Sequence, residues 1–135
     1  MDLHGLHVLL AEDNDLNAEI AVSLLEEQGM IVPRAAAGKS ALIQFCNTAP
    51  GTFDLILMDI MMPEMNGYET TKAIRNLPDR PDGKEIPIIA MTANAFEEDA
   101  RKCVEAGMNA HIPKPMNMKQ VLSILITVLK KDYKF

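Results

Sequence analysis

The chain lacks the features that mark membrane, secreted and nucleic-acid-binding proteins. No uninterrupted apolar stretch reaches the roughly 18 residues that a membrane span needs. The first residues lack the basic start and apolar core of a signal peptide. Acidic residues outnumber basic ones by 19 to 13, and the net charge of −6 would repel a phosphate backbone or an anionic membrane surface. We therefore expect a cytoplasmic protein with no direct contact to nucleic acid or membrane.

Cysteine and histidine are scarce as well. Cys46 and Cys103 stand far apart, with no Cys-x-x-Cys pair, and the three histidines never occur at the spacing of metal ligands. A zinc site is therefore disfavoured. Free cysteine is among the most buried residue types, so both thiols are expected to be buried structural groups. Hard oxygen ligands, such as carboxylates, are the remaining indication of a metal site.

The length and the apolar pattern predict one α/β domain over residues 1–135, with a core over about 6–130. A chain of this size buries about two-thirds of the surface that it exposes when unfolded. Strand-like apolar runs alternate with helical patterns five times, which predicts a parallel sheet built from βαβ units. The predicted strands are 6–11, 31–36, 53–59, 86–91 and 110–113. The five predicted helices are 15–28, 38–47, 66–76, 96–106 and 117–130, and the polar segment 77–84 is predicted to be a loop.

Proline positions predict the order of the strands. Proline lacks a backbone N–H and is confined to edge strands, strand starts or bulges. Pro33 lies within the second strand and Pro113 ends the fifth, whereas the first and third strands contain no proline. Pro87 fits as the opening residue of the fourth. The doubly wound, flavodoxin-like order 2-1-3-4-5 satisfies these constraints and makes the first and third strands neighbours, about 4.8 Å apart.

Acidic residues follow both central strands of this sheet. Glu12 and Asp13 come after the first strand, and Asp59 ends the third. The carboxyl ends of parallel strands form the ligand crevice of an open α/β sheet. Like charges at this separation need a cation or a shifted pKa, and Mg²⁺ accepts one or two carboxylates together with waters and phosphate oxygens. Solvated strand-end acids, some of them capping helices, are the alternative interpretation.

A hydroxyl and an ammonium are expected at the same edge of the sheet. Thr92 ends the fourth strand, and Lys114 follows the fifth. Together with the acids they would form a phosphoryl site, in which one carboxylate attacks phosphorus and these two residues bind phosphoryl oxygens. The alternatives are a helix-entry cap for Thr92 and a solvated surface position for Lys114.

Four motifs at these positions resemble the receiver domain of two-component response regulators, in order and in spacing. They are Glu12-Asp13-Asn14-x-x-Asn17, Met58-Asp59-Ile60-Met61-Met62-Pro63-Glu64-Met65-Asn66-Gly67-Tyr68-Glu69, Met91-Thr92-Ala93-Asn94-Ala95 and Lys114-Pro115. The first and third are most similar to receivers of hybrid sensor histidine kinases. A stand-alone response regulator is the alternative.

The resemblance implies that Asp59 accepts a phosphoryl group from a phosphohistidine on a histidine kinase or a histidine phosphotransfer domain. Mg²⁺, or Mn²⁺ in its place, would be bound by Asp13, Asp59 and the backbone carbonyl of Met61, with Glu12 acting through water. Such a domain phosphorylates and dephosphorylates itself and is not a turnover enzyme.

Two further residues have roles implied by the resemblance. Thr92 and Lys114 would contact the phosphoryl group, and the Lys114-Pro115 bond would be cis, as X-Pro bonds permit. Phosphorylation would pull Thr92 inward and shift the surface formed by the fourth helix, fifth strand and fifth helix between two states. The same surface is a candidate homodimer interface.

Two residues depart from the family pattern, and two others stand at positions that tune its chemistry. His111 stands where the family usually has a switch tyrosine or phenylalanine, and its smaller imidazole ionises near neutral pH, so a half-exposed strand residue is an equal alternative to a switch. Asn66 replaces the more usual aspartate and is expected to form a turn or cap a helix. Met61 and Asn94 occupy positions that tune hydrolysis in the family, and we hypothesise that apolar Met61 hinders the attacking water.

Other function classes fit the chain less well. A flavodoxin-type binder would need a hydroxyl- and glycine-rich phosphate loop where this chain has acids. Gly38-Lys39-Ser40 is similar to the end of a P-loop, but Pro33 stands where that motif needs glycine. An aspartyl-phosphate hydrolase would want a second acid at Met61. A phosphorylation-independent binding module would lack the acceptor, an acid or the lysine, all of which are present.

Overall fold

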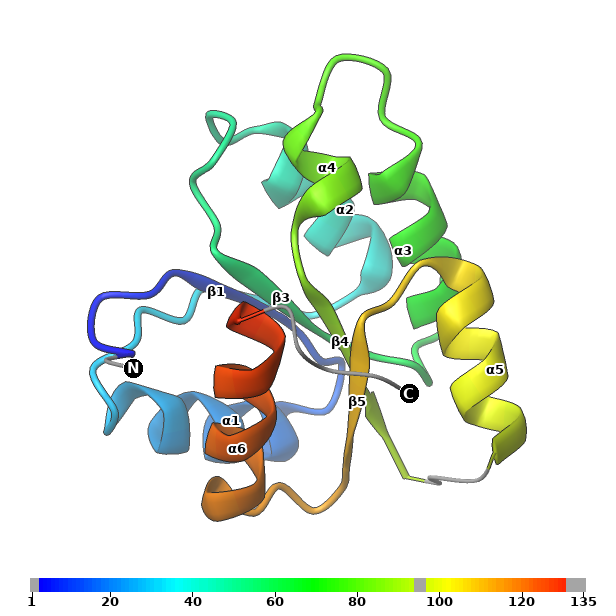
Figure 1. The fold of residues 1–135 in the computed structure, drawn as a ribbon. Helices are drawn as coiled ribbons and strands as arrows, with labels where there is room; N and C mark the ends of the chain where they lie inside the picture. Colours follow the sequence, from blue (N-terminus) through cyan, green and yellow to red (C-terminus); the bar gives the residue numbers. More distant parts are fainter. Residues whose placement is uncertain (1–2, 94–96, 131–135) are drawn as a thin grey trace.

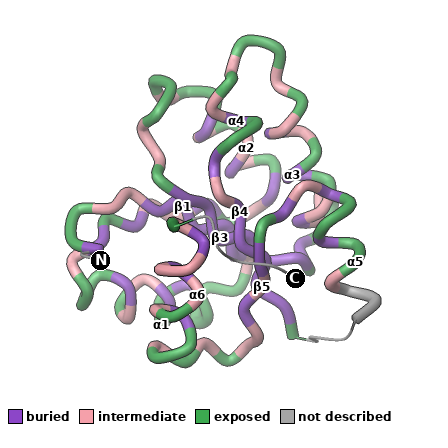
Figure 2. Tube along the Cα trace, in the orientation of Figure 1, coloured by how far each residue is buried: buried purple, intermediate pink, exposed green. Residues whose placement is uncertain are grey.

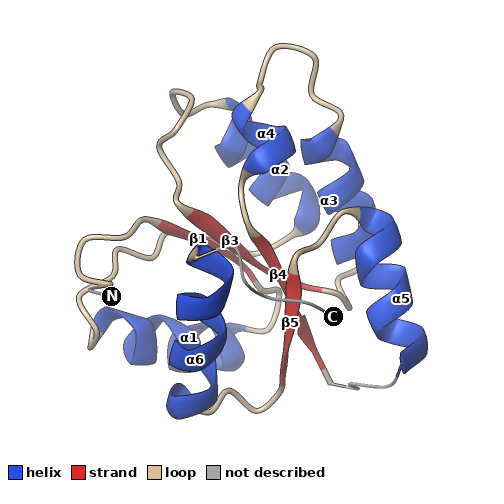
Figure 3. Ribbon diagram, in the orientation of Figure 1, coloured by secondary structure: helices blue, strands red, loops and turns tan. Residues whose placement is uncertain are grey.

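A computed structural model describes residues 3–93 and 97–130, in which five strands and six helices form an α/β fold (Figures 1 and 3). The strands are β1 (Val8–Ala11), β2 (Arg34–Ala35), β3 (Leu55–Asp59), β4 (Ile88–Thr92) and β5 (Ala110–Pro113). The helices are α1 (Asp15–Glu26), α2 (Gly38–Cys46), α3 (Gly67–Arg75), α4 (Asp82–Glu85), α5 (Glu97–Ala106) and α6 (Met118–Leu129). No helix in this part of the chain has the length and apolar character that a bilayer span needs.

All strand pairs are parallel, and the strand order β2-β1-β3-β4-β5 confirms the predicted topology. Strands β2 and β5 lie at the two edges, as the proline positions predicted. The second strand is shorter than predicted: it pairs at Arg34 and Ala35, and Ile31 adds one isolated bridge to His7. Pro33 has no N–H to donate, although its carbonyl accepts a 2.9 Å hydrogen bond from the backbone of Leu10.

The sheet is covered on both faces, so its central strands are buried (Figure 2). Helices α1 and α6 pack on one face, against a cluster that includes Val8 and Leu10. Helices α2, α3 and α5 pack on the other face, against a cluster that includes Leu9 and Ala11. Burial on both faces explains why these strands are continuous apolar runs rather than alternating ones.

The predicted loop 77–84 is wrong in part, because it contains the first residues of the one-turn helix α4. Arg80 fixes the entry to this turn: its guanidinium forms a two-pronged ion pair with Asp82, at 3.0 and 2.9 Å, and donates a 2.7 Å hydrogen bond to the carbonyl of Phe45. The contact with Phe45 joins residues that are 35 positions apart, so local turn chemistry does not predict it. Helix α4 lies at the end of the sheet opposite the carboxyl ends of the strands (Figure 1).

Asparagine side chains begin three of the helices. Asn14 accepts from the backbone N–H of Asn17 at the start of α1, and Asn117 does the same for Gln120 at the start of α6. Asn66 forms a complete capping box with Glu69 at the start of α3, which confirms its predicted role as a cap. Each cap directs the chain from the carboxyl edge of the sheet into the helix that follows.

The two cysteines have different surroundings. Cys103 is buried among the helices of one face, as predicted, whereas Cys46 is exposed at the end of α2. The expected burial is therefore wrong for Cys46. Neither forms a disulfide, and neither belongs to the cluster of acids at the carboxyl ends of the strands.

Candidate functional site

The carboxyl ends of four strands bring the predicted site residues to one edge of the sheet. Glu12 follows β1, Asp59 is the last residue of β3, Thr92 is the last of β4, and Lys114 follows β5. The register keeps neighbouring ends level, since Asp59 pairs with Met91 and Thr92 pairs with Pro113. The expected juxtaposition follows directly from the strand order.

Three carboxylates form a compact cluster at this edge. Glu12, Asp13 and Asp59 each present an oxygen, and the three oxygens lie within 4.8 Å of one another. Glu12 and Asp59 are 2% and 3% exposed, whereas Asp13 is half-buried. Three hard oxygen donors at this separation, open to solvent on one side through Asp13, fit a cation such as Mg²⁺ that retains part of its water shell.

The ammonium of Lys114 bridges two of these acids. Its Nζ lies 2.9 Å from Asp59 Oδ1 and 2.9 Å from Glu12 Oε1. The lysine side chain is 27% exposed, so this is a largely buried, charge-assisted contact rather than the solvated surface lysine of the alternative interpretation. The backbone of Lys114 is also fixed, since its N–H donates a 2.8 Å hydrogen bond to the carbonyl of Thr92.

Burial and charge separate the two buried acids. Burial, reinforced by the neighbouring Glu12, raises the pKa of Asp59 to about 7, although the Lys114 ammonium opposes this rise. Burial also acts on Glu12, but hydrogen bonds from Lys114 and from the Asn14 backbone outweigh it and lower the pKa of Glu12. Asp59 is thus the acid whose charge depends most on a further cation. The two carboxylates likewise hold the pKa of Lys114 above its ordinary value despite burial.

The turn that carries Glu12 is held by a residue that sequence patterns did not single out. Arg34, at the start of β2, donates from Nε and Nη2 to the Glu12 carbonyl at 3.0 and 2.8 Å. Its Nη2 also lies 2.9 Å from Asp15 Oδ1. The available signal was an arginine on the edge strand beside the acidic end of the first strand. The sequence alone does not distinguish such an arginine from the other arginines and lysines of a solvated surface.

The loop after β3 is shaped for a close approach to Asp59. A Cβ at Gly67 would overlap the carbonyl oxygen of Asp59, so only glycine fits there. Met61 lies in this loop with 78% of its surface exposed and helps to line a shallow hollow with Met62, Pro63 and Asn66. The roles of the Met61 carbonyl and side chain remain predictions.

Thr92, His111 and the Lys114-Pro115 bond lie on β4, on β5 and just after it. Thr92 is buried, and His111 is half-buried in register with Ala90. The Lys114-Pro115 peptide bond is cis, which confirms that prediction. Asn94, the second predicted residue of the hydrolysis pair, lies outside the described residues.

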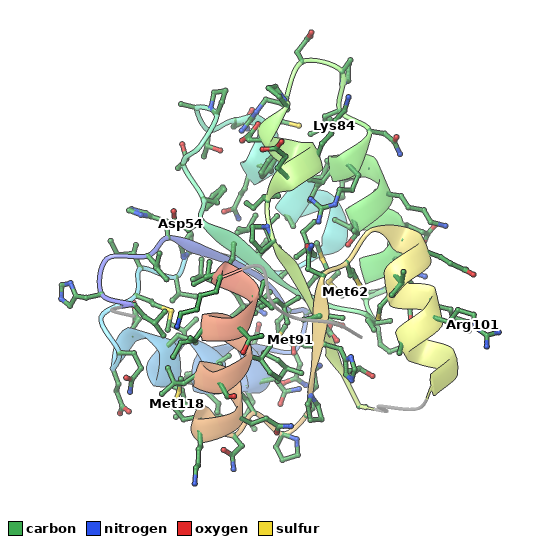
Figure 4. The ribbon with its side chains drawn as sticks, viewed as in Figure 1. Asp54, Met62, Lys84, Met91, Arg101 and Met118 are labelled. Carbon is green, nitrogen blue, oxygen red and sulfur yellow. The ribbon has the colours of Figure 1, made fainter. Side chains whose placement is uncertain are left out.

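An apolar cavity of about 310 Å³ opens beside the acid cluster. It lies between α1 and the segment after β5, and its lining residues are Glu12, Asn17, Ile20, Ala21, Met91, Lys114, Pro115 and Met116. Figure 4 labels Met91, the lining residue that comes from β4. Ile20 is 47% exposed at its rim. The cavity therefore places an apolar wall next to Glu12 and Lys114.

The relatives of the chain are receiver domains and the kinases that contain them. A family model described as the response regulator receiver domain matches residues 8–126. The chain is 41% identical to hybrid signal transduction histidine kinase B of Dictyostelium discoideum and 33% identical to histidine kinase 1 of Arabidopsis thaliana. These matches cover 92% and 95% of this chain but only 6% and 13% of the relatives, so the chain spans a small part of their length.

Solved structures agree with the sequence comparison. The receiver domain of a sensor histidine kinase from Pseudomonas aeruginosa, whose structure has a magnesium ion coordinated in the active site cleft, is 34% identical and superimposes with a TM-score of 0.82. That match covers 93% of this chain and 98% of the other. A chemotaxis response regulator of Vibrio cholerae is 28% identical, with a TM-score of 0.82, over 92% of this chain and 98% of that one. The chain therefore belongs to the response regulator receiver domain family of two-component signalling.

Proposed function

We propose that Asp59 takes a phosphoryl group from a phosphohistidine on a histidine kinase or histidine phosphotransfer partner, in a Mg²⁺-dependent reaction. The observation that carries this proposal is one buried carboxylate that lies within 4.8 Å of two others and 2.9 Å from an ammonium. Such a constellation offers carboxylate oxygens to a metal ion and places an ammonium beside the acceptor, and the two cations would together neutralise the charge of a phosphoryl group. Residues 1–135 would then act as a single receiver domain.

In the transfer, an oxygen of Asp59 forms a bond to phosphorus while the bond from phosphorus to the donor imidazole nitrogen breaks. The imidazole leaves with that electron pair and takes up a proton. Glu12 and Asp13 would hold Mg²⁺ together with Asp59 and the Met61 carbonyl, with Glu12 acting through water and Mn²⁺ as an alternative ion. The cation supplies charge neutralisation of the phosphoryl oxygens when bound.

Lys114 and Thr92 are the remaining reaction groups of the proposal. Lys114 already contacts Asp59 at 2.9 Å, so its ammonium would move from the free carboxylate to an oxygen of the new acyl phosphate. The hydroxyl of Thr92 would bind a second phosphoryl oxygen at the end of β4. Since nucleophilic attack needs the ionised carboxylate, a pKa near 7 makes the cation part of the activation of Asp59.

The wider setting is proposed from the relatives. Their histidine kinase names support an origin in a hybrid histidine kinase, with a stand-alone regulator as the alternative. Inward movement of Thr92 would shift the surface of α5, β5 and α6, on which His111 is half-buried. The same surface is where a homodimer would form.

The test is the intact mass of the chain after incubation with acetyl phosphate and Mg²⁺. We expect a gain of one phosphoryl group, about 80 Da, that is absent without Mg²⁺ and in Asp59→Asn. A parallel incubation uses a phosphorylated histidine phosphotransfer domain as the donor. No gain from either donor would contradict the proposal, and a gain in Asp59→Asn would assign the chemistry to another residue.

A further inference from the structure

The main chain of Glu12 is held by a residue of β2, which lies beside β1 on the side opposite β3 and Asp59. The Arg34 fork places two N–H groups on one oxygen, at 3.0 and 2.8 Å, while the arginine side chain is 27% exposed. The same turn is tied internally by a 3.1 Å hydrogen bond from the Asn14 N–H to Glu12 Oε2. The carboxylate of Glu12 therefore cannot reorient without disturbing a turn that Arg34 anchors.

We infer that Arg34 is a positioning residue for the acid cluster: its guanidinium fixes the Glu12 main chain and thereby the carboxylates that bind the cation. The effect on Mg²⁺ rests on the proposed function, whereas the effect on the turn does not. Groups that orient metal ligands from behind typically change metal affinity by about 10-fold or more when removed.

The fork is needed because a single donor would leave the turn free to pivot. Two N–H groups on one carbonyl fix direction as well as distance, and a planar guanidinium supplies them, whereas an ammonium acts as a point charge. The start of β2 is a suitable place for this group, because the Glu12 N–H also pairs with the Ala35 carbonyl at 3.0 Å. The edge strand thus holds Glu12 at both its N–H and its C=O.

An effect of charge alone and an effect of positioning predict opposite changes in Mg²⁺ affinity when Arg34 is removed. The direction of the measured change therefore tests the inference. Arg34 is a cation that contacts the main chain of one of the three acids, so its removal would strengthen Mg²⁺ binding if only electrostatics mattered. If positioning dominates, removal weakens binding because the acids lose their fixed arrangement. The partner Asp15 contributes little to either effect, since it is 92% exposed and its ion pair is screened.

The experiment measures Mg²⁺ affinity by isothermal titration calorimetry on the folded chain. We expect Arg34→Ala to weaken binding by about 10-fold. Arg34→Lys, which keeps the charge without the fork, should fall between this variant and the unmodified chain. Unchanged or tighter binding in Arg34→Ala would overturn the inference, and unmodified affinity in Arg34→Lys would overturn the need for the fork.

Arg80→Ala is the matched control. Arg80 also donates to main-chain carbonyls, at Phe45 and Cys46, and also pairs with an aspartate, but it precedes α4 at the opposite end of the sheet. Its removal should lower stability without changing Mg²⁺ affinity. An equal loss of Mg²⁺ affinity in Arg80→Ala would show that the effect of Arg34→Ala comes from general destabilisation, which would overturn the inference.

A second readout needs no metal. Hydrogen exchange of the Asn14 amide, followed by NMR in metal-free protein, should be faster in Arg34→Ala than in the unmodified chain, because the turn that holds the Asn14 N–H against the Glu12 side chain loses its anchor at the Glu12 carbonyl. Unchanged exchange would overturn the inference. If the unmodified chain binds no Mg²⁺, the proposed function fails while this measurement still decides the role of Arg34.

Discussion

Arg75 joins three segments of the fold at the end remote from the acids. From the end of α3, its guanidinium donates to the carbonyl of Gly107 at 2.9 and 2.8 Å, to those of Gly83 and Ile86 at 3.0 and 2.7 Å, and to Asn109 Oδ1 at 2.9 Å. Burial lowers the pKa of this arginine. One side chain therefore connects α3 with α4 and with the turn after α5.

We expect Arg75→Met to destabilise the fold by about 3 to 4 kcal/mol. Three carbonyl oxygens lose their donor, at about 1–3 kcal/mol for each acceptor that stays buried without a partner. Relief from burying a charge offsets part of this loss. Urea unfolding followed by circular dichroism would measure it. At a slope of about 2 kcal/mol per M, the midpoint should fall by roughly 1.5 to 2 M.

The control for this experiment is Arg101→Met, since Arg101 points away from the sheet on the exposed side of α5 (Figure 4). Its replacement should change the free energy of unfolding by less than about 0.5 kcal/mol. Arg75→Lys should lie between the two, because an ammonium cannot serve all these acceptors at once. A loss below about 1 kcal/mol in Arg75→Met would refute the reasoning, since water would then replace the guanidinium without cost.

Three further predictions concern the site edge. Asn66→Ala should cost about 1 kcal/mol in urea unfolding through loss of the α3 cap, whereas Asn66→Asp should cost little; equal costs would exclude capping as the cause. The raised pKa of Asp59 means that the folded chain binds this proton more tightly than the unfolded chain. The metal-free free energy of unfolding should thus fall as pH rises from about 4 to 7, and less steeply in Asp59→Asn; identical profiles would contradict the shift. Met61→Asn should speed loss of the phosphoryl group in a mass time course, and an unchanged rate would show that Met61 does not hinder water.

The sequence predicts most of the topology because the constraints that set it are local. Pro33 and Pro113 exclude their strands from the centre of the sheet, and the fifth predicted strand coincides with β5. The acids at the strand ends reach one edge for the same reason. Once strand order is known, the position of Asp59 beside Glu12 follows from geometry.

The parts that the sequence does not predict depend on contacts between distant segments. Helix α4 follows Arg80, which is 35 residues from its acceptor Phe45, and Arg75 reaches 32 residues along the chain to Gly107. Arg34 acts over 22 residues. All three are arginines whose function is to donate to carbonyls. No short-range pattern separates such arginines from those that remain in solvent.

The burial of the sheet on both faces has a consequence for how the strands align during folding. In a sheet with one wet face, a slip of one residue exposes the apolar set to solvent, and this penalty fixes the alignment. Here Leu55 to Met58 are all buried, so a slipped β3 would still place apolar groups on both faces. A slip toward the interior would instead draw the Asp59 carboxylate between apolar layers, away from Lys114. The charged strand end thus selects the native alignment.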